Sequence, residues 1–252
     1  MSNLSDYRLL SFDVYGTLID WESGILAAFK PILDRDGAER FTRKHLFYVF
    51  HKLEREQQAK TPNMPYSQLL STVHPQFAAT LGLDKPTAEE SKEFGESVGN
   101  WPAFPDTVDA LRRLSKFYKL LVLSNVDRES FNATNAGPLQ GVHFDAIITA
   151  QDVGSYKPDL RNFEHMLKYV QSTFGIGKEG VLQTAQSQVH DHHPASEMGI
   201  RSVWIARPGA SMGNALQEIC YWKFNTLGEM ADALQQEIAL STTYSLAESN
   251  LF

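Results

Sequence analysis

Asp13 is the first residue in the chain whose type and position could support chemistry. It follows a short apolar run, Leu9–Phe12, and precedes Gly16 and Thr17. The run predicts a buried strand that delivers Asp13 to its carboxyl end, where open α/β sheets bind their ligands. Gly16 permits a sharp turn, and the Thr17 hydroxyl can reach back to orient the carboxylate. Because an aspartate at a strand end is more often a turn former or helix cap, the case for a nucleophile depends on residues downstream.

Polar side chains also follow three later apolar runs, each of which predicts a buried strand. These side chains are Ser124 with Asn125, Lys157, and Asp191. Taken one at a time they have ordinary explanations, namely a turn, a solvated lysine and a helix cap. Their order and strand-end placement favour one shared pocket, because the carboxyl ends of parallel strands meet at one edge of a sheet.

Two patterns of secondary structure position these residues. After residue 100, strands alternate with helices, with strands expected at about 119–123, 146–148, 181–185 and 202–205 and a last helix at about 227–238. Before it, a block without strand signals predicts helices at about 21–36, 38–59, 66–81 and 86–98. We expect an α/β fold with a Rossmann-like, doubly wound, mostly parallel sheet and an inserted α-helical cap.

The same patterns give the expected domain organisation. The core comprises residues 1–20 and 101–240, the cap residues 21–100, and a polar C-terminal tail residues 241–252. Trp21 and Trp101 flank the insertion, so they are expected to lie close together at a hinge, although ordinary core tryptophans are an equally good interpretation.

Composition restricts the classes of function. With 252 residues and 42% hydrophobic content, the chain can bury a substantial core. A net charge of −7 argues against nucleic acid or an anionic membrane as a partner and favours a small-molecule substrate. A single cysteine excludes an intramolecular disulfide and a multi-thiolate metal site, and the N-terminus carries no long apolar segment. We therefore expect a soluble, cytoplasmic protein, and a homodimer is left open.

The motifs around these residues resemble those of the haloacid dehalogenase-like hydrolase (HAD) superfamily. Phe-Asp-Val-Tyr-Gly-Thr-Leu at 12–18 matches its first motif and Leu123-Ser124-Asn125 its second. Lys157-Pro158 matches the third, and the segment from Ala185 to Asp191 matches the fourth. The resemblance spans nearly the whole chain and implies the HAD fold, with residues 21–100 as its cap.

Within the superfamily, the first motif is most similar to that of the type II (S)-2-haloacid dehalogenases. Phosphatases usually carry an aspartate at the position of Tyr15, because an alkoxide leaving group must be protonated, whereas halide leaves without a proton. The resemblance implies that Asp13 attacks C2 of a 2-haloacid to form an ester, and that Thr17 orients it. It implies that Lys157 keeps Asp13 ionised and that Asp191 orients Lys157 and a water molecule.

Substrate-binding roles also follow from the resemblance. Ser124 and Asn125 are expected to bind the substrate carboxylate and the developing oxyanion, with Tyr15 and Gln186 beside them. The match is incomplete, since Phe163 replaces a tyrosine, and Gln186 and Gln188 replace a serine and an asparagine. The cap arginine that receives halide has no clear counterpart, and His51 and Arg55 are the nearest candidates.

Two other functions remain open. A phosphatase acting on a small phosphorylated metabolite would use Mg²⁺, but Gln186 stands where phosphatases place a magnesium-binding aspartate, and an amide is a poorer ligand. A catalytically silent binding protein is the third interpretation, although it need not retain Asp13, Lys157 and Asp191 together. We expect no metal and no cofactor.

The run His190, His192 and His193 could suggest a transition-metal cluster. Consecutive histidines at a helix start point in different directions, and no second group of ligands completes such a site. We therefore expect one of these histidines to pack near the pocket and the other two to be solvated.

Overall fold

A parallel six-stranded sheet forms the centre of the molecule, in the order β3-β2-β1-β4-β5-β6. The computed structural model describes residues 2–35, 41–215 and 217–249. The strands are β1 (Leu9–Phe12), β2 (Lys119–Ser124), β3 (Ala146–Thr149), β4 (Val181–Ala185), β5 (Arg201–Ile205) and β6 (Trp222–Phe224). The predicted doubly wound fold is confirmed. The sequence analysis missed β6, whose three residues are exposed or half-buried and lack the apolar run that marks the inner strands.

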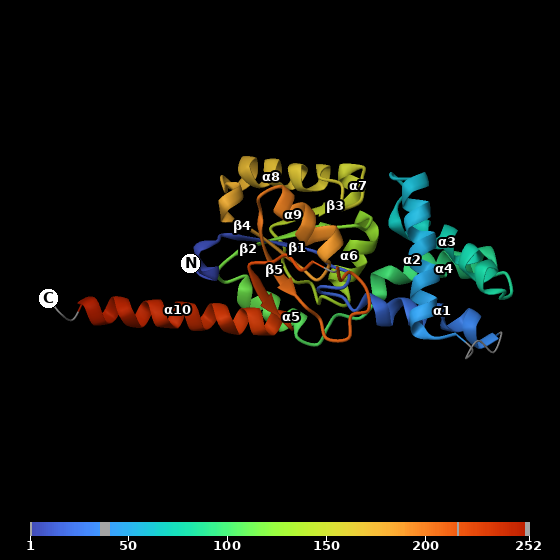
Figure 1. Ribbon diagram of the computed structural model, residues 1–252, viewed down its shortest axis with the longest axis horizontal. Coiled ribbons are helices and arrows are strands. Elements are labelled where there is room, and N and C mark those ends of the chain that lie inside the picture. Colours follow the sequence, from blue (N-terminus) through green and yellow to red (C-terminus); the bar gives the residue numbers. More distant parts are fainter. Residues whose placement is uncertain (1, 36–40, 216, 250–252) are drawn as a thin grey trace.

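Helices cover both faces of the sheet because successive strand residues point to opposite sides. On β1, Leu9 faces α8 (Arg161–Phe174) and α9 (His193–Glu197), whereas Leu10 faces α5 (Thr107–Leu114) and α10 (Leu227–Ser249). Figure 1 shows α8 along one face and α5 with α10 along the other. The remaining core helices are α6 (Arg128–Ala136) and α7 (Ala150–Val153). Within the described residues, no helix combines the length and apolar character needed to cross a bilayer.

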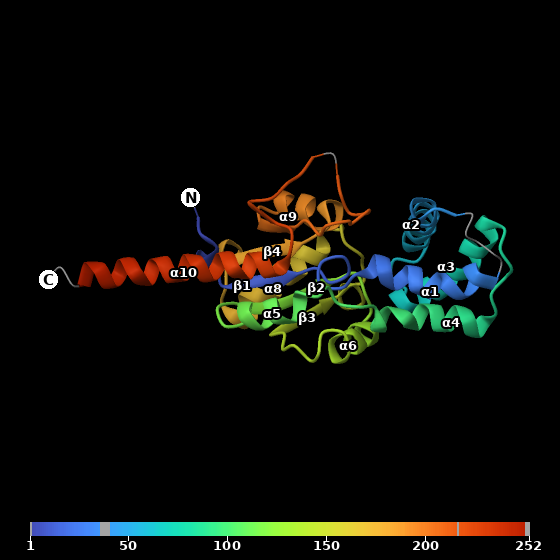
Figure 2. The ribbon, with the colours of Figure 1, turned by 90° about the horizontal axis from the view of Figure 1, so that it is seen from below.

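The segment between β1 and α5 folds into a separate group of helices at one end of the sheet (Figure 2). These helices are α1 (Trp21–Arg35), α2 (Arg43–Lys60), α3 (Tyr66–Leu81) and α4 (Ala88–Glu96). Phe29 stacks on Phe77 with ring centroids 3.9 Å apart, and both belong to an apolar core that is continuous with one face of the sheet. The limits of α3 are as predicted. The helix predicted from residue 38 begins later, because α2 starts at Arg43 with Thr42 as its N-cap, and the predicted stop at Gly37 lies outside the described residues. The domain boundaries at 21 and 100 stay a prediction.

The last helix differs from the expectation. We predicted a helix ending near residue 238 and a loose tail from 241, but α10 continues to Ser249 and extends past the sheet (Figure 1). The segment 239–249 contains neither glycine nor proline, so nothing in the backbone chemistry stops the helix there. Its polarity alone was a poor guide to where the helix ends.

A buried arginine holds the loop that follows Asp13. Arg207 donates from Nε to the carbonyl of Thr17 at 3.0 Å and pairs through Nη1 with Asp106. Thr107 donates from its hydroxyl to the carbonyl of Leu18 at 2.9 Å. Burial opposes the charge on Asp106, but the hydrogen bond and charge of Arg207 outweigh it and hold the pKa of Asp106 below its ordinary value. Side chains of Arg207 and Thr107 therefore hold the backbone of the loop that follows Asp13.

Replacing Asp106 by Asn should lower the free energy of unfolding by about 2 kcal/mol at pH 7, because it leaves the buried Arg207 without a counter-ion. The pKa of Asp106 is lower in the folded protein than in the unfolded chain. Its ion pair with Arg207 therefore adds to the free energy of unfolding above the unfolded pKa, and this stabilisation is lost as pH falls below about 4. Urea unfolding of the wild type and the variant from pH 7 to below pH 4 measures this difference in the free energy of unfolding. Asp109→Asn, on the exposed side of the same helix, is the matched control and should change little. An Asp106 effect that grows with acid would contradict the assignment.

Candidate active site

Asp13 lies immediately after β1, where the sequence placed it. Its backbone amide donates to the carbonyl of Thr184 on β4, and its side chain is almost fully buried. Thr17 donates from its hydroxyl to Asp13 Oδ2 at 2.6 Å, as expected. The intervening turn places Gly16 at φ 103°, a conformation that favours glycine. The carboxylate is therefore held in one orientation at the sheet edge.

Lys157 brings the core residues together. Its Nζ donates to Asp13 Oδ1 at 3.0 Å, to Asp191 Oδ1 at 2.6 Å and to the carbonyl of Leu123 at 2.8 Å. Burial opposes the positive charge, but Asp13 and Asp191 outweigh it and raise the pKa of Lys157 above its ordinary value. Burial, opposed by Lys157 and reinforced by Asp13, raises the pKa of Asp191 to about 7. One ammonium is thus shared by two carboxylates.

Ser124 and Asn125 end β2 beside this lysine. The Asn125 side chain accepts from the Lys157 amide at 2.6 Å and donates to the Lys157 carbonyl at 2.9 Å, so it clamps the backbone of the lysine. One N–H of its side-chain nitrogen remains for a ligand. Ser124 Oγ is buried and has no hydrogen-bond partner among the described residues. The Ser124 hydroxyl is therefore available to donate a hydrogen bond to an oxygen atom of a bound ligand.

Tyr15 and Gln186 occupy the two positions at which the resemblance to the HAD superfamily implies aspartates in phosphatases. The Tyr15 hydroxyl lies 2.9 Å from Thr134 Oγ1, and burial raises the pKa of this phenol well above its ordinary value. Gln186 donates from Nε2 to the carbonyl of Met212 at 2.9 Å. A neutral phenol and an amide already engaged with a loop do not fit a magnesium site. Among the described side chains, no three of the His, Cys, Asp and Glu types gather closely enough to bind a metal ion.

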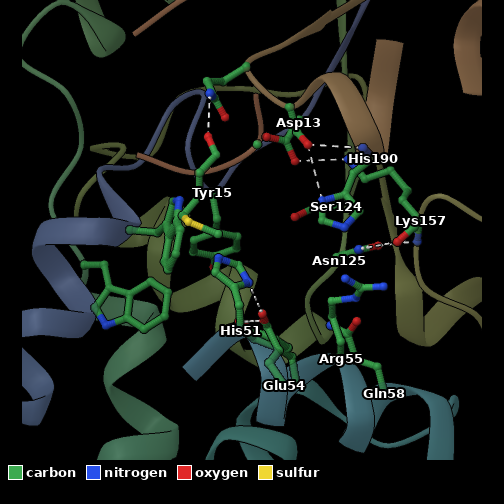
Figure 3. A pocket seen from close by; sticks show the side chains of 17 residues that line it. Asp13, Tyr15, His51, Glu54, Arg55, Gln58, Ser124, Asn125, Lys157 and His190 are labelled. Carbon is green, nitrogen blue, oxygen red and sulfur yellow. Dashed lines mark hydrogen bonds and ion pairs between the residues drawn. The ribbon is translucent and has the colours of Figure 1, made fainter. Parts of the chain in front are cut away.

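Helix α2 supplies the cap side of the site (Figure 3). His51 Nδ1 lies 3.0 Å from Glu54 Oε2, and Tyr66 donates to Glu54 Oε1 at 2.5 Å. Arg55 also lines the pocket but is exposed to solvent. The sequence analysis named His51 and Arg55 but missed Glu54 and Tyr66. The spacing of His51 and Glu54, three residues apart on one helical face, was the signal that could have revealed the pair.

The histidine run is arranged differently from the expectation. His190 lines the pocket, as expected for one of the three. His192 is wholly buried, with Nδ1 2.8 Å from Ser202 Oγ and Nε2 2.9 Å from the Ala185 carbonyl, so the prediction that it is solvated was wrong. The chain enters a π-helical turn, Gln188–His192, which rotates Asp191 and His192 into the interior together.

Seven of the nine predicted site residues line one cavity, which lies between the sheet edge and the cap and has a volume of about 120 Å³; the other two are Thr17 and Asp191. Thr17 and Asp191 lie behind it, in contact with Asp13 and Lys157 respectively. Trp21 and Trp101, at the two ends of the insertion, both line the cavity. The volume approaches the ~150 Å³ of cavities that hold a benzene molecule, which favours a ligand of a few heavy atoms.

Comparison with known proteins identifies similar molecules. Residues 7–180 match the family of haloacid dehalogenase-like hydrolases. The (S)-2-haloacid dehalogenase of Pseudomonas sp. (strain YL) is 27% identical over 205 residues, which cover 79% of this chain and 83% of that protein. Haloacetate dehalogenase H-2 of Moraxella sp. (strain B) is 28% identical over 207 residues, covering 79% and 86%.

A solved structure confirms the likeness of fold. It is an L-2-haloacid dehalogenase from Xanthobacter autotrophicus with chloropropionic acid covalently bound. Its TM-score to this chain is 0.73 at 17% identity, over 91% of this chain and 98% of that one. The parallel sheet with its flanking helices is therefore an established arrangement in this group of proteins.

Lys157→Met should lower the free energy of unfolding by about 3–5 kcal/mol at pH 7, because two buried carboxylates lose their shared cation. Lys157→Met combined with Asp191→Asn should recover part of this loss, since one of the two charges is removed. Denaturant unfolding of the single and double variants measures both effects. Lys168→Met, on an exposed position of α8, is the control. A single variant as stable as the wild type would show that the lysine is not paired as described.

Proposed function

The chain belongs to the haloacid dehalogenase-like hydrolase family, and on that premise we propose that it is a dehalogenase of small (S)-2-haloacids that needs no metal. The observation that carries the proposal is the combination of Asp13, fixed by Thr17 and Lys157, with neutral side chains at Tyr15 and Gln186. Such a site offers a nucleophile without the second carboxylate that phosphate ester hydrolysis and magnesium binding require. The named dehalogenase relatives support the same choice.

In the first step Asp13 attacks C2 of the substrate on the side opposite the halogen. A bond forms between a carboxylate oxygen and C2 as the carbon–halogen bond breaks, and its electron pair leaves with the halide. The Lys157 ammonium, 3.0 Å away, stabilises the carboxylate form of Asp13 before the attack. The orphaned Ser124 hydroxyl and the remaining Asn125 N–H are donors for the substrate carboxylate.

In the second step water attacks the carbonyl carbon of the Asp13 ester. The bond from that carbon to the product oxygen breaks, so the water oxygen stays on Asp13 and the departing 2-hydroxy acid has inverted configuration. One water proton goes to the departing oxygen, and the other is released. Asp191 Oδ2, which has no partner within the described part of the chain, is an acceptor beside Lys157 that can orient this water.

The two competing functions are less well supported. A phosphatase would need an acid and magnesium ligands that Tyr15 and Gln186 do not provide. A silent binding protein gives no reason to keep a buried lysine between two carboxylates, an arrangement that is costly unless each charge is satisfied. The proposal therefore includes neither magnesium nor another cofactor, and the partner is a small carboxylate.

Wild-type protein should convert L-2-chloropropionate to D-lactate at a rate that EDTA does not change, with little or no turnover of phosphate esters. Halide release, chiral analysis of lactate and phosphate release, each with and without magnesium, measure this. Asp13→Asn should release no halide while keeping the fold, because an amide is a far weaker nucleophile than a carboxylate. Magnesium-stimulated phosphate release without halide release from any 2-haloacid would overturn the dehalogenase and favour the phosphatase.

A further inference from the structure

A second cavity of about 190 Å³ lies next to the cavity that Asp13 lines, which we call the first cavity. Trp21 and Gln186 line both cavities, so these two residues form the wall between them. The second cavity has no part in the mechanism above. Its apolar lining comes from Trp21, Phe104, Pro208 and Ala210. It therefore offers space and apolar surface just beyond the site.

The side chain of Gln186 fills a gap in this wall. Its Nε2 donates to the carbonyl of Met212 at 2.9 Å and to Asn214 Oδ1 at 3.3 Å, which fixes the amide. A Cβ placed on Gly16, which lines the second cavity, would lie 3.6 Å from Gln186 Oε1. A Cβ on Gly213, which lines the first cavity, would overlap the same oxygen. The amide thus occupies the space between two glycines, one on each cavity.

Other contacts hold the backbone that carries this side chain. The Gln186 amide donates to Thr17 Oγ1 at 2.8 Å, and the Gln186 carbonyl accepts from Trp204 Nε1 at 2.8 Å. Trp21, the other part of the wall, packs against Phe47 with ring centroids 5.5 Å apart. Shortening the side chain of Gln186 therefore removes part of the wall and leaves its surroundings in place.

The charged side chains around the second cavity already have partners. Arg207 pairs with Asp106, and Arg43 Nη2 lies 2.7 Å from Glu22 Oε2. Asp20 accepts two hydrogen bonds from the first turn of α1. Within the described part of the chain, this cavity therefore has no unpartnered cation to attract a carboxylate. Its apolar lining suits an uncharged alkyl chain instead.

The first cavity has little room beyond that needed by a small acid. Cavities of ~150 Å³ hold benzene, which has six non-hydrogen atoms. The acid 2-chloropropionate also has six, so it fills a cavity of about 120 Å³. A longer alkyl chain needs further space, and the nearest lies behind Gln186.

Resting on the proposed function, we propose that Gln186 restricts the substrates to 2-haloacids of two or three carbons by closing the second cavity to the alkyl chain. Gln186 is then a specificity-determining residue, because it decides which substrate fits beside Asp13. The bonds that form and break are those of the mechanism above. Removing this part of the wall would turn the second cavity into a binding subsite for the alkyl chain of a longer acid.

The test compares kcat/KM for L-2-chloropropionate and L-2-chlorohexanoate. The wild type should prefer the shorter acid by about 100-fold or more, because three further methylenes find no space. Gln186→Ser removes most of the side chain, so this preference should fall by about tenfold or more as the alkyl chain enters the second cavity. Gln186→Met keeps the length of the side chain and loses the amide, so it should retain the preference.

A substitution on the far side of the wall shows where the alkyl chain binds. Ala210 lines the second cavity and not the first. Ala210→Phe alone should not change the preference for the shorter acid, but added to Gln186→Ser it should cancel the gain for L-2-chlorohexanoate. Calorimetric binding of L-2-chlorohexanoate to Asp13→Asn, with and without Gln186→Ser, makes the same comparison without turnover. The affinity should rise when the wall is shortened.

The outcomes separate this inference from the proposed function. A preference that falls in Gln186→Ser, persists in Gln186→Met and returns with Ala210→Phe supports the inference. Equal rates for both acids in the wild type would overturn it, as would an unchanged preference in folded Gln186→Ser, an equal fall in Gln186→Met, or a gain that Ala210→Phe leaves intact.

A further variant covers the case in which Gln186→Ser does not fold. Gln186→Asn is one methylene shorter than the wild-type side chain and keeps the amide, so it should shift the preference in the same direction by a smaller factor. No shift in that variant would overturn the inference. Absence of halide release from every 2-haloacid would instead overturn the proposed function itself.

Discussion

The ammonium of Lys157 lies between two buried carboxylates, and the geometry of the sheet edge depends on this contact. Charges removed from water are tolerated only when each has a partner at hydrogen-bond distance. Asp13 comes from β1, Asp191 from the turn after β4, and the lysine from the loop after α7. Three separate parts of the core must therefore keep their positions for the site to be stable. The clamp from Asn125 to the lysine backbone supplies the remaining constraint.

The cap completes the site from the opposite side, and several contacts hold it there. Asp127, on the core, accepts from the Ser67 amide of the cap at 2.9 Å. Glu22, at the start of α1, accepts from the Ser211 amide at 2.8 Å, in the loop that carries Met212 into the pocket. These contacts keep the cavity small. Because a small cavity admits little water, charges within it interact more strongly, which suits the nucleophilic role proposed for Asp13.

Much of the core of the site could be predicted because Asp13 and Ser124 lie at strand ends. Apolar runs in the sequence indicated β1 and β2 and so these two residues, whereas Lys157, also predicted at a strand end, lies beyond the short helix α7 that follows β3. Asp191 was placed at a helix start, whereas it occupies a π-helical turn that also buries His192. No periodic pattern marks such a turn in the sequence. The length of α10 was missed for a related reason, since polar residues are compatible with both helix and loop.

The cap side could be predicted only in part. The resemblance indicates His51 as a counterpart of a cap arginine, but a histidine on an amphipathic helix has no distinctive neighbour until the packing of α2 against α3 places Tyr66 beside Glu54. That contact joins residues twelve positions apart and depends on how the two helices cross. Helical spacing alone does not specify it. The arrangement of side chains on the cap side of the cavity is therefore decided by tertiary packing that the local sequence does not encode.

The proposed mechanism depends on a covalent ester between the substrate and Asp13, which is paired with Lys157. A single turnover in oxygen-18 water, followed by mass spectrometry of the peptide that contains Asp13, tests it most directly. Because water attacks the enzyme-side carbonyl, the account predicts that the first turnover places the label in Asp13 and leaves the product unlabelled. Label found in the product of that first turnover, with Asp13 unlabelled, would contradict covalent catalysis by this residue.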